Sequence, residues 1–371
     1  MNILHVTTFL NGGAGKVLVD LAMSQADSGH QVCVIANKTE FEGYRHYKEH
    51  VERLSYSGIF FETCDSLFKR DPFLNKRASH ELIEIFSDSK VFDVVHSHAS
   101  LPAKICYEAF SESHTKPFYI QTMHGWGLNK TEQMEEDDVN TMNTLDSIVS
   151  LNQSGKKLLL SKGVKHSLLH VIPNGISCNL PRETKLSSDL TNFLGMRKWY
   201  MKFLCIGEVG ERKNQIFLMR ALNQLNQMGI VCSAVFIGPE QNVGYYAKCI
   251  KDNCVDGLCY WIGEVPNASS YMQHFDAVVL PSNSEGMPIS IIEAFRAKVL
   301  VFGSRISEIE ELLSEQRGYL FDIESTQEFV ELVTSFDPSS VPDITQNAYK
   351  LYRNQYTLSV VADAYFELYQ K

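Results

Sequence analysis

Residues 280–294 read Leu-Pro-Ser-Asn-Ser-Glu-Gly-Met-Pro-Ile-Ser-Ile-Ile-Glu-Ala, which predicts a strand, a loop and a helix in that order. The strand ends near Leu280, and Pro288 suits the first helical turn, where its missing N–H would be unpaired anyway. A helix N-terminus is a natural seat for a diphosphate. Glu285 on the loop can accept hydrogen bonds from sugar hydroxyls, and Glu293 on the helix can take the two ribose hydroxyls. The spacing alone is equally typical of two solvated glutamates; its setting favours a nucleotide-sugar site.

The same order of strand, loop and helix recurs on both sides of this stretch, in two separate series. The strands expected in the first series are Ile3–Phe9, Gln31–Ala36, Val91–Val95, Phe118–Thr122, Ser147–Ser150 and Leu169–Ile172. Those expected in the second are Phe203–Ile206, Val231–Ile237, Leu258–Ile262, Ala277–Leu280 and Val299–Phe302. Short apolar strands between helices predict parallel sheets. The fold class is therefore α/β, with two doubly wound Rossmann-like domains that are expected to face each other across a ligand-binding cleft.

The predicted domain boundaries follow from this repetition. Residues 1–178 form the first, acceptor-side domain, and residues 195–354 form the second, nucleotide-sugar-binding domain. The polar stretch from about Ser177 to Arg197 is interpreted as the linker. The last helix, at about residues 355–371, is expected to pack back on the first domain.

Composition excludes several classes of protein. The 371 residues are 44% hydrophobic and 21% charged, which is globular composition. The net charge of −10 is shared by both halves, which argues against nucleic acid as a main partner. Nine cysteines, no secretory leader and no apolar run of about 18 residues predict a cytoplasmic protein whose membrane contact, if any, is peripheral at the inner face. No zinc site is expected from the cysteine spacing.

Two further loops carry candidate phosphate contacts. Gly207-Glu-Val-Gly-Glu-Arg-Lys-Asn214 follows the first strand of the second domain, and its Arg212 and Lys213 could neutralise a departing diphosphate. An exposed basic pair is the alternative. Asn11-Gly-Gly-Ala-Gly-Lys16 is interpreted as a flexible loop before a helix from Lys16; it lacks the Gly-Lys-Ser/Thr of an ATPase and the spacing of a nicotinamide site. It suits a close backbone approach to sugar or phosphate, or a tight turn only.

Histidines follow two strands of the first domain. His96 and His98 come after Val91–Val95, and His124 comes after Phe118–Thr122. Such histidines are more often satisfied core residues than metal ligands. We interpret His124 as a sugar contact and His98 as an acceptor-side contact.

The motifs together resemble the retaining glycosyltransferases of family four, which have the GT-B fold. The resemblance is carried, in order along nearly the whole chain, by Gly12-Gly13, Thr122-Met-His-Gly125, Ile172-Pro-Asn-Gly-Ile176, Arg212-Lys-Asn214 and Glu285-Gly-Met-Pro…Glu293-Ala. It implies a nucleoside diphosphate sugar donor, most often a UDP-sugar, with no cofactor and no essential metal. It also implies a glycan or lipid-linked saccharide acceptor, in bacterial lipopolysaccharide, capsule or other surface polysaccharide synthesis.

The resemblance also assigns site residues, position by position. The residues implied as catalytic are Glu285, His124, Lys213 and Arg212. Those implied to bind the donor are Gly12, Gly13, Glu293, Gly286, Met287, Pro288, Ile289, Ile262 and Val265, the last two through the base. No metal ligand is implied. Two positions depart from the family pattern: Glu208 stands where many members have arginine, and Ala297-Lys-Val-Leu replaces Gly-x-Pro.

The expected reaction retains the anomeric configuration. No carboxylate pair is placed for double displacement, so a same-face route is favoured, in which the leaving phosphate helps to deprotonate the acceptor. The absence of Asp-x-Asp agrees with metal independence. A UDP-sugar epimerase of the same build, an inactive sugar-nucleotide-binding protein and, less favoured, a nicotinamide oxidoreductase remain as alternatives.

Basic and aromatic residues of the first domain suggest a possible membrane contact. Phe68 directly precedes Lys69-Arg70, and Phe73 lies between that pair and Lys76-Arg77; such a cluster could touch an anionic surface. An ordinary solvated loop explains it equally well, given the acidity of the chain.

Overall fold

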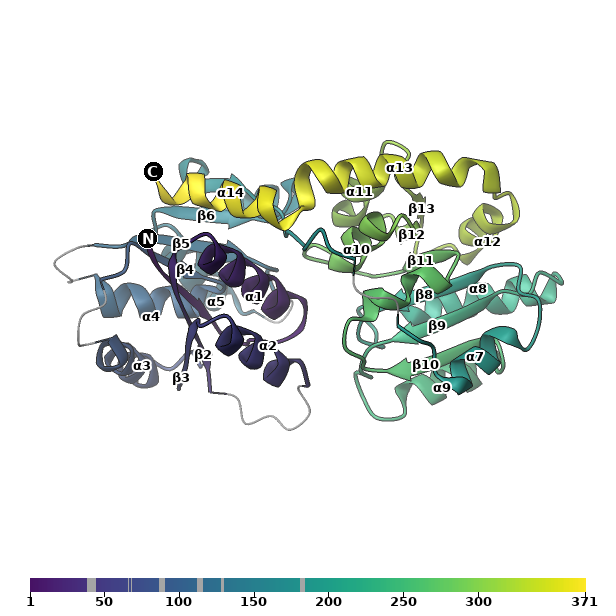
Figure 1. The fold of residues 1–371 in the computed structure, drawn as a ribbon, viewed down its shortest axis with the longest axis horizontal. Helices are drawn as coiled ribbons and strands as arrows, with labels where there is room; N and C mark the ends of the chain where they lie inside the picture. Colours follow the sequence, from purple (N-terminus) through teal and green to yellow (C-terminus); the bar gives the residue numbers. More distant parts are fainter. Residues whose placement is uncertain are drawn as a thin grey trace. The chain divides into compact units, whose positions relative to one another are not determined.

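The computed structural model describes residues 1–38, 45–65, 67, 69–86, 91–111, 116–127, 130–180 and 184–371. They form two compact units (Figure 1). Unit 1 comprises residues 1–177 together with 356–371, and unit 2 comprises residues 178–355. All nine cysteines are free thiols.

Unit 1 is built on a seven-stranded parallel sheet with the order β3-β2-β1-β4-β5-β6-β7. Its strands are β1 (Asn2–Thr7), β2 (Gln31–Asn37), β3 (Phe60–Cys64), β4 (Val94–Ser97), β5 (Phe118–Met123), β6 (Ser147–Ser150) and β7 (Leu169–Val171). Its helices are α1 (Gly12–Asp27), α2 (Arg45–Tyr56), α3 (Pro72–Phe86), α4 (Ser100–Phe110), α5 (Glu132–Met142), α6 (Gln153–Ser161) and α14 (Leu358–Tyr369). The interior strands are buried on both faces, which is typical of a parallel sheet covered on both sides.

Unit 2 repeats the architecture with six parallel strands in the order β10-β9-β8-β11-β12-β13. Its strands are β8 (Lys202–Ile206), β9 (Ser233–Ile237), β10 (Cys259–Gly263), β11 (Ala277–Leu280), β12 (Leu300–Ser304) and β13 (Tyr319–Phe321). Its helices are α7 (Ser188–Gly195), α8 (Gln215–Gln227), α9 (Tyr245–Asp252), α10 (Ile289–Ala297), α11 (Ser307–Leu313), α12 (Thr326–Thr334) and α13 (Val341–Leu351). The predicted fold class, two doubly wound Rossmann-like domains, is confirmed.

The C-terminal helix α14 lies on unit 1, although 178 residues of unit 2 precede it (Figure 1). Its Val361, Tyr365 and Leu368 pack with Ile3 of β1 and Val94 of β4. The polypeptide therefore passes from unit 1 to unit 2 and returns, and its last helix covers one face of the first sheet.

Three local predictions were wrong. The glycine stretch after β1 is not a loop, because α1 begins at Gly12 and Asn11 caps it by accepting the Gly12 N–H at 2.8 Å. The predicted linker contains α7, which Ser187 caps and which buries Leu190 and Phe193 in unit 2. His96 does not follow a strand; it lies within β4 and is fully buried.

Candidate functional site

The loops of interest in unit 2 follow two neighbouring strands, β8 and β11. The sheet order runs from β8 through β9 to β10 on one side, and from β11 through β12 to β13 on the other. The order therefore reverses between β8 and β11, and ligands of doubly wound sheets bind beyond the carboxyl ends of the strands at this point. Residues 207–214 and 281–288 occupy that position, each between a strand and a helix.

Asn283 joins these two loops. Its backbone N–H donates to the carbonyl of Arg212 at 2.9 Å, and its side-chain amide donates to the carbonyl of Glu211 at 2.8 Å. The amide of Asn214 donates to the Asn283 side-chain oxygen at 3.2 Å. These three bonds hold the basic residues of one loop beside the glutamate of the other. Asn283 was not predicted as a site residue, since its position after a strand is the one feature of the sequence that indicates such a role.

Glu285, Lys213 and Arg212 form one charged cluster. The Lys213 ammonium lies 2.6 Å from one carboxylate oxygen of Glu285, and the Arg212 guanidinium lies 3.3 Å from the other. The side chain of Glu285 is 6% exposed and that of Lys213 is 13% exposed, whereas Arg212 is 43% exposed. Arg212 also donates to the carbonyl of Ser284 at 3.2 Å. The structure thus brings together the carboxylate and both cations that the sequence assigned to one reaction site.

Backbone geometry directs Lys213 toward Glu285. Gly207 has φ +144°, and a Cβ built there would lie 3.0 Å from Cε of Lys213, so glycine leaves room for the lysine chain to cross the backbone. Asn214, which precedes α8, has φ +53°, a left-handed conformation that asparagine tolerates. The turn from β8 into α8 therefore depends on residues suited to positive φ.

The helix α10 starts one residue later than predicted, with Pro288 as its N-cap rather than in its first turn. Glu293 lies on its second turn and is 7% exposed, so it is not a solvated surface glutamate. Met287 is buried, and Gly286 and Ile289 are partly exposed beside the N-terminus of the helix. These residues could present N–H groups to an anion there. Ile262 lies at the end of β10 and Val265 in the loop that follows; both are partly exposed, at the same edge of the sheet.

In unit 1, the corresponding edge carries the N-terminus of α1 and two of the histidines. Gly12 and Gly13 form the exposed first turn of α1, directly after β1. The glycine of this turn that packs closely against the backbone is Gly15, where a Cβ would lie 2.7 Å from the carbonyl carbon of Leu10. His98 follows β4 and His124 follows β5, so both histidines lie at the carboxyl edge.

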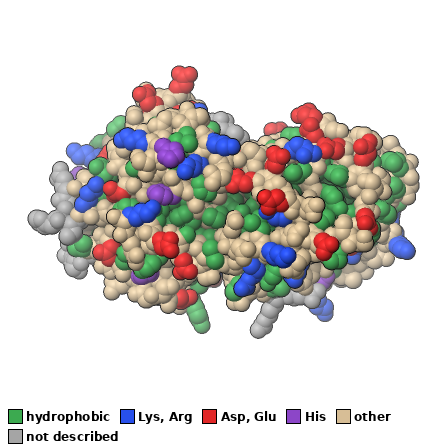
Figure 2. Space-filling view, turned by 90° about the horizontal axis from the view of Figure 1, so that it is seen from above, with side chains coloured by type: hydrophobic (Ala, Val, Ile, Leu, Met, Phe, Trp, Pro, Cys, Tyr) green, Lys and Arg blue, Asp and Glu red, His purple; other side chains and the backbone are tan. Residues whose placement is uncertain are grey.

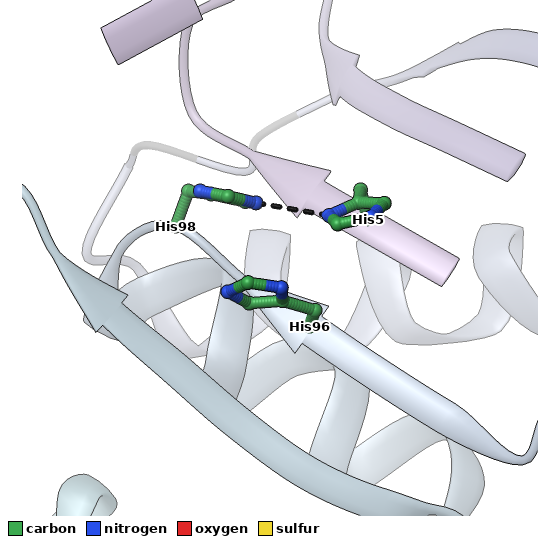
Figure 3. A group of neighbouring side chains, drawn as sticks. All are labelled: His5, His96 and His98. Atoms are coloured by element: carbon green, nitrogen blue, oxygen red, sulfur yellow. Dashed lines mark hydrogen bonds between the residues drawn. The ribbon is translucent and has the colours of Figure 1, made fainter. Parts of the chain in front are cut away.

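His98 is enclosed by other histidines. Its Nε2 lies 3.0 Å from Nδ1 of His5, and its Nδ1 lies 2.9 Å from Nε2 of His124. Figure 3 shows His5 on β1 and His96 on β4, with His98 beside them. The ring of His98 stacks on that of His96, and their centroids lie 4.4 Å apart. Both ring nitrogens of His98 already face protein partners, and the side chain is 7% exposed. This geometry suits a supporting residue better than the acceptor-side contact expected from sequence.

Burial keeps these histidines neutral. Desolvation lowers the pKa of His5 and of His124 to about 4, and it lowers the pKa of His96 and of His98 well below the usual value. The nearby histidines depress the pKa values of His96 and His98 further. His5 was not predicted from sequence, because a single histidine inside an apolar strand resembles an ordinary core residue.

Comparison with known proteins agrees with this arrangement. The profile described as Glycosyltransferase Family 4 matches residues 11–180, and that described as Glycosyl transferases group 1 matches residues 192–350. TuaC of Bacillus subtilis, named as a teichuronic acid biosynthesis glycosyltransferase, is 25% identical over 75% of this chain and 70% of its own length. The UDP-Gal:alpha-D-GlcNAc-diphosphoundecaprenol alpha-1,3-galactosyltransferase of Escherichia coli is 22% identical over 68% of each chain.

Solved structures show the same fold over the whole chain. A glycosyltransferase from Rickettsia africae superposes with a TM-score of 0.84 at 17% identity, covering 100% of this chain and 97% of that one. HepE from Anabaena, solved with UDP-glucose, superposes with a TM-score of 0.80 at 19% identity and 99% coverage of both chains. Two family profiles that together span nearly the whole sequence, and this fold, show that the chain belongs to the family-four glycosyltransferases with the GT-B fold.

Proposed function

We propose that the protein transfers a sugar, with retention of configuration, from a UDP-sugar to a lipid-linked saccharide in bacterial surface-polysaccharide synthesis. The observation that carries the proposal is the cluster of Glu285, Lys213 and Arg212 at the switch point of unit 2. HepE was solved with UDP and with UDP-glucose, and the Escherichia coli relative uses UDP-Gal and a diphosphoundecaprenol-linked acceptor by its name. These relatives support both the donor class and the acceptor class.

Each part of the cluster has a role in this proposal. Lys213 and Arg212 bind the diphosphate and stabilise the charge that develops on it as it leaves. Glu285 holds these two cations in the ligand-free protein, and it accepts hydrogen bonds from the donor sugar when the diphosphate takes over their charge. Glu293 binds the ribose, and the N-terminus of α10 binds phosphate or sugar through residues 286–289.

The reaction proceeds on one face of the sugar. The leaving phosphate oxygen takes the proton of the acceptor hydroxyl, so no separate protein base is required. The gain in rate then comes from positioning and from stabilisation of the diphosphate charge. Arg212 compensates for Glu208, which stands where many family members have a phosphate-binding arginine. No metal takes part in this scheme.

A donor screen tests this function. Purified protein is incubated with UDP-, GDP- and ADP-sugars and an undecaprenyl-diphosphate-linked GlcNAc acceptor, and the product linkage is read by NMR. We expect a UDP-sugar to be consumed and the anomeric configuration to be retained, with and without EDTA. An inverted product, loss of transfer in EDTA, or conversion of the UDP-sugar without acceptor would overturn the proposal; the last result would favour an epimerase.

Membrane contact belongs to the same proposal. No helix among the described residues is both long and apolar enough to cross a bilayer. Phe73 of α3 is 78% exposed, and Lys69 and Lys76 are exposed beside it. The Arg70 guanidinium forms a 2.6 Å ion pair with the buried carboxylate of Asp138, so Arg70 is assigned to the stability of unit 1 and not to membrane contact. Phe68 lies outside the described residues.

Flotation with anionic vesicles tests the membrane contact. We expect Lys69→Gln/Lys76→Gln/Phe73→Ser to reduce flotation, while Lys156→Gln/Lys157→Gln on α6 of the same unit leaves it unchanged. Equal flotation of both variants would remove the membrane contact from the proposal. Arg70 is left in place, because its removal would unpair a buried carboxylate.

A further inference from the structure

One continuous chain of hydrogen bonds runs beneath α1 and α14 on one face of the sheet in unit 1. The strands place its members side by side: His5 of β1 is in register with His96 of β4, and two-residue steps put His98 and Thr122 on the same face. The links in order are His124–His98 at 2.9 Å, His98–His5 at 3.0 Å, His5–Gln25 at 2.7 Å, Gln25–Tyr369 at 3.2 Å, Tyr369–His96 at 2.7 Å, His96–Thr122 at 2.8 Å and Thr122–Tyr365 at 2.8 Å.

The same nitrogens do not suit a metal ion. Nitrogens of His5, His96 and His98 lie within 4.8 Å of one another, which is the spacing of a three-histidine site. Yet every ring nitrogen of these three residues already has a hydrogen-bond partner among the described side chains. A metal bound by one nitrogen of each histidine would displace the present hydrogen-bond partners of those nitrogens. The geometry therefore points to a hydrogen-bonded chain.

Because the histidines are neutral, every hydrogen bond between two of them has one donor and one acceptor nitrogen, and the whole hydrogen-bonded series must point one way. A neutral imidazole has one N–H donor and one bare acceptor nitrogen. Two histidines linked nitrogen to nitrogen therefore cannot change tautomer independently. The tautomer of one end of the series His5–His98–His124 fixes the tautomer of the other end.

Gln25 sets the direction. Its side-chain carbonyl faces Nε2 of His5, and its amide N–H donates to the hydroxyl of Tyr369. His5 must then donate from Nε2 and accept at Nδ1. His98 consequently donates from Nε2 to His5, and His124 donates from Nε2 to His98. Nδ1 of His124 is left as a bare acceptor, and it has no hydrogen-bond partner within the described part of the chain.

We propose that Gln25, His5 and His98 are positioning residues that fix the tautomer of His124, so that His124 presents an acceptor nitrogen, Nδ1, to the ligand. An acceptor nitrogen binds a hydroxyl, which donates, and it repels a phosphate or carbonyl oxygen. His124 therefore selects a group that donates a hydrogen bond, and on a sugar that group is a hydroxyl. That this hydroxyl belongs to the donor sugar rests on the proposed function; the fixed tautomer does not.

Nitrogen-15 NMR of the histidine rings in the ligand-free protein tests the proposal. We expect His5, His98 and His124 each to carry the proton on Nε2 at pH 7.5. Gln25→Met removes the acceptor for His5 at similar volume, and His124 should then show a mixture of both tautomers. Tyr369→Phe is the matched control: it removes a link of the same buried chain on the far side of Gln25, and His124 should keep the Nε2 proton.

The outcomes separate this proposal from the function. A proton on Nδ1 of His124 in the unmodified protein, or an unchanged tautomer in Gln25→Met, would overturn the proposal. If the Met variant does not fold, His5→Phe replaces it, because a phenyl ring leaves Nε2 of His98 without its acceptor, and His124 should again show a mixture of both tautomers. A change in the Nδ1 signal of His124 on adding UDP-glucose supports the sugar contact. The expected tautomers without that change leave the positioning chain standing and count against the role of His124 in the proposed function.

Discussion

At the residue scale, Glu285 is the group on which the candidate site of unit 2 depends. Its carboxylate is nearly buried, and it is the shared partner of Lys213 and Arg212. A carboxylate in this position keeps two cations beside each other that would otherwise repel. In the proposed function, the charge of a bound diphosphate takes over that role, and the glutamate becomes available to the sugar.

Glu285→Gln tests this exchange. The amide keeps the shape but cannot balance the two cations, so we expect turnover to fall by roughly a hundredfold or more while the protein remains folded. Glu211→Gln, on the neighbouring exposed side chain of the other loop, should stay within about twofold of the unmodified enzyme. Rates with the best donor of the screen, and melting curves for both variants, provide the measurement. Near-normal turnover of Glu285→Gln would remove it from the catalytic group.

The buried histidines predict a stability that depends on pH. Burial lowers the pKa values of His5 and His124 from the usual 6.5 to about 4 in the folded state. Between pH 4 and pH 6.5 the unfolded state therefore binds more protons than the folded state. The stabilisation of the neutral forms is complete above about pH 6.5 and is lost as the pH falls from 6.5 toward 4, by about 1.4 kcal/mol per pH unit for each such histidine.

Urea unfolding at pH 7.5, 6.5, 5.5 and 5.0 measures this dependence. His5→Gln, which removes one buried imidazole and its pKa shift, should show a shallower decline below pH 6.5 than the unmodified protein. His80→Gln is the control, since His80 is exposed on α3. A free energy of unfolding that stays level from pH 7.5 to 5.0 would contradict the neutral state of the buried histidines.

At the scale of elements, the contact between α14 and the segment after β7 depends on Gly175. A Cβ at this position would lie 2.8 Å from Cβ of Val361 and 3.0 Å from Cα of Leu358, so even alanine would push the helix away. We expect Gly175→Ala to lower the free energy of unfolding by about 1–3 kcal/mol, the usual cost of overpacking. Thermal and urea unfolding measure it.

Gly195→Ala is the matched control for that substitution. No atom lies within 4 Å of a Cβ built at Gly195, and the residue is in the last turn of α7. Alanine is the better helix former, so this variant should be neutral or slightly more stable. If both variants unfold at the same midpoint, α14 does not pack on Gly175 as closely as the structure has it.

The sequence predicted the interior elements better than the edges. β6 and β11 were predicted to the residue. β11 is a continuous apolar run, as expected of a strand buried on both faces, and β6 is an apolar pair, Ile148 and Val149, between two buried serines. Two of the four edge strands, β3 and β13, were missed: β3 is half exposed, and β13 has only three residues. The first turn of α1 was interpreted as a loop because glycine is a poor helix former, and the cap at Asn11 outweighed that tendency.

At the candidate site, the positions of the residues could be predicted from sequence, whereas their contacts could not. Glu285 and Lys213 could be placed from sequence at carboxyl ends of strands, because topology alone carries them there. Their pairing across 72 residues, and the link between His5 and His98 across 93, depend on strand order and side-chain direction. No local pattern encodes such contacts, so only the structure supplies them.

At the scale of the whole molecule, the two units differ in how the chain builds them. Unit 2 is one continuous segment with its own core around β8, β11 and α8, whereas unit 1 is completed only by residues 356–371. Charged side chains of both signs are interspersed over the face shown in Figure 2, and no patch of one sign dominates that face. The net charge of the whole chain is −10. Nothing on that face resembles the basic surface of a nucleic-acid-binding protein.

This difference predicts how fragments behave. Residues 178–355 should fold alone, because a continuous segment of 178 residues with one core is an ordinary domain. Residues 1–177 alone should be unstable, since the apolar face around Ile3, Val94 and Ile120 loses its cover and His96 loses Tyr369. Circular dichroism and urea unfolding of the two fragments give the comparison.

Restoring the missing helix completes the test. A fragment in which residues 356–371 are joined to residue 177 through a flexible linker should regain cooperative unfolding, because it again contains every element of unit 1. The same fragment with Tyr365→Ser and Leu368→Ser should not, since both side chains are buried against the sheet. If residues 1–177 unfold as cooperatively as the linked form, α14 is an accessory and not part of the core. If residues 178–355 fold and bind UDP in calorimetry, the nucleotide site lies within unit 2, as the cluster around Glu285 requires.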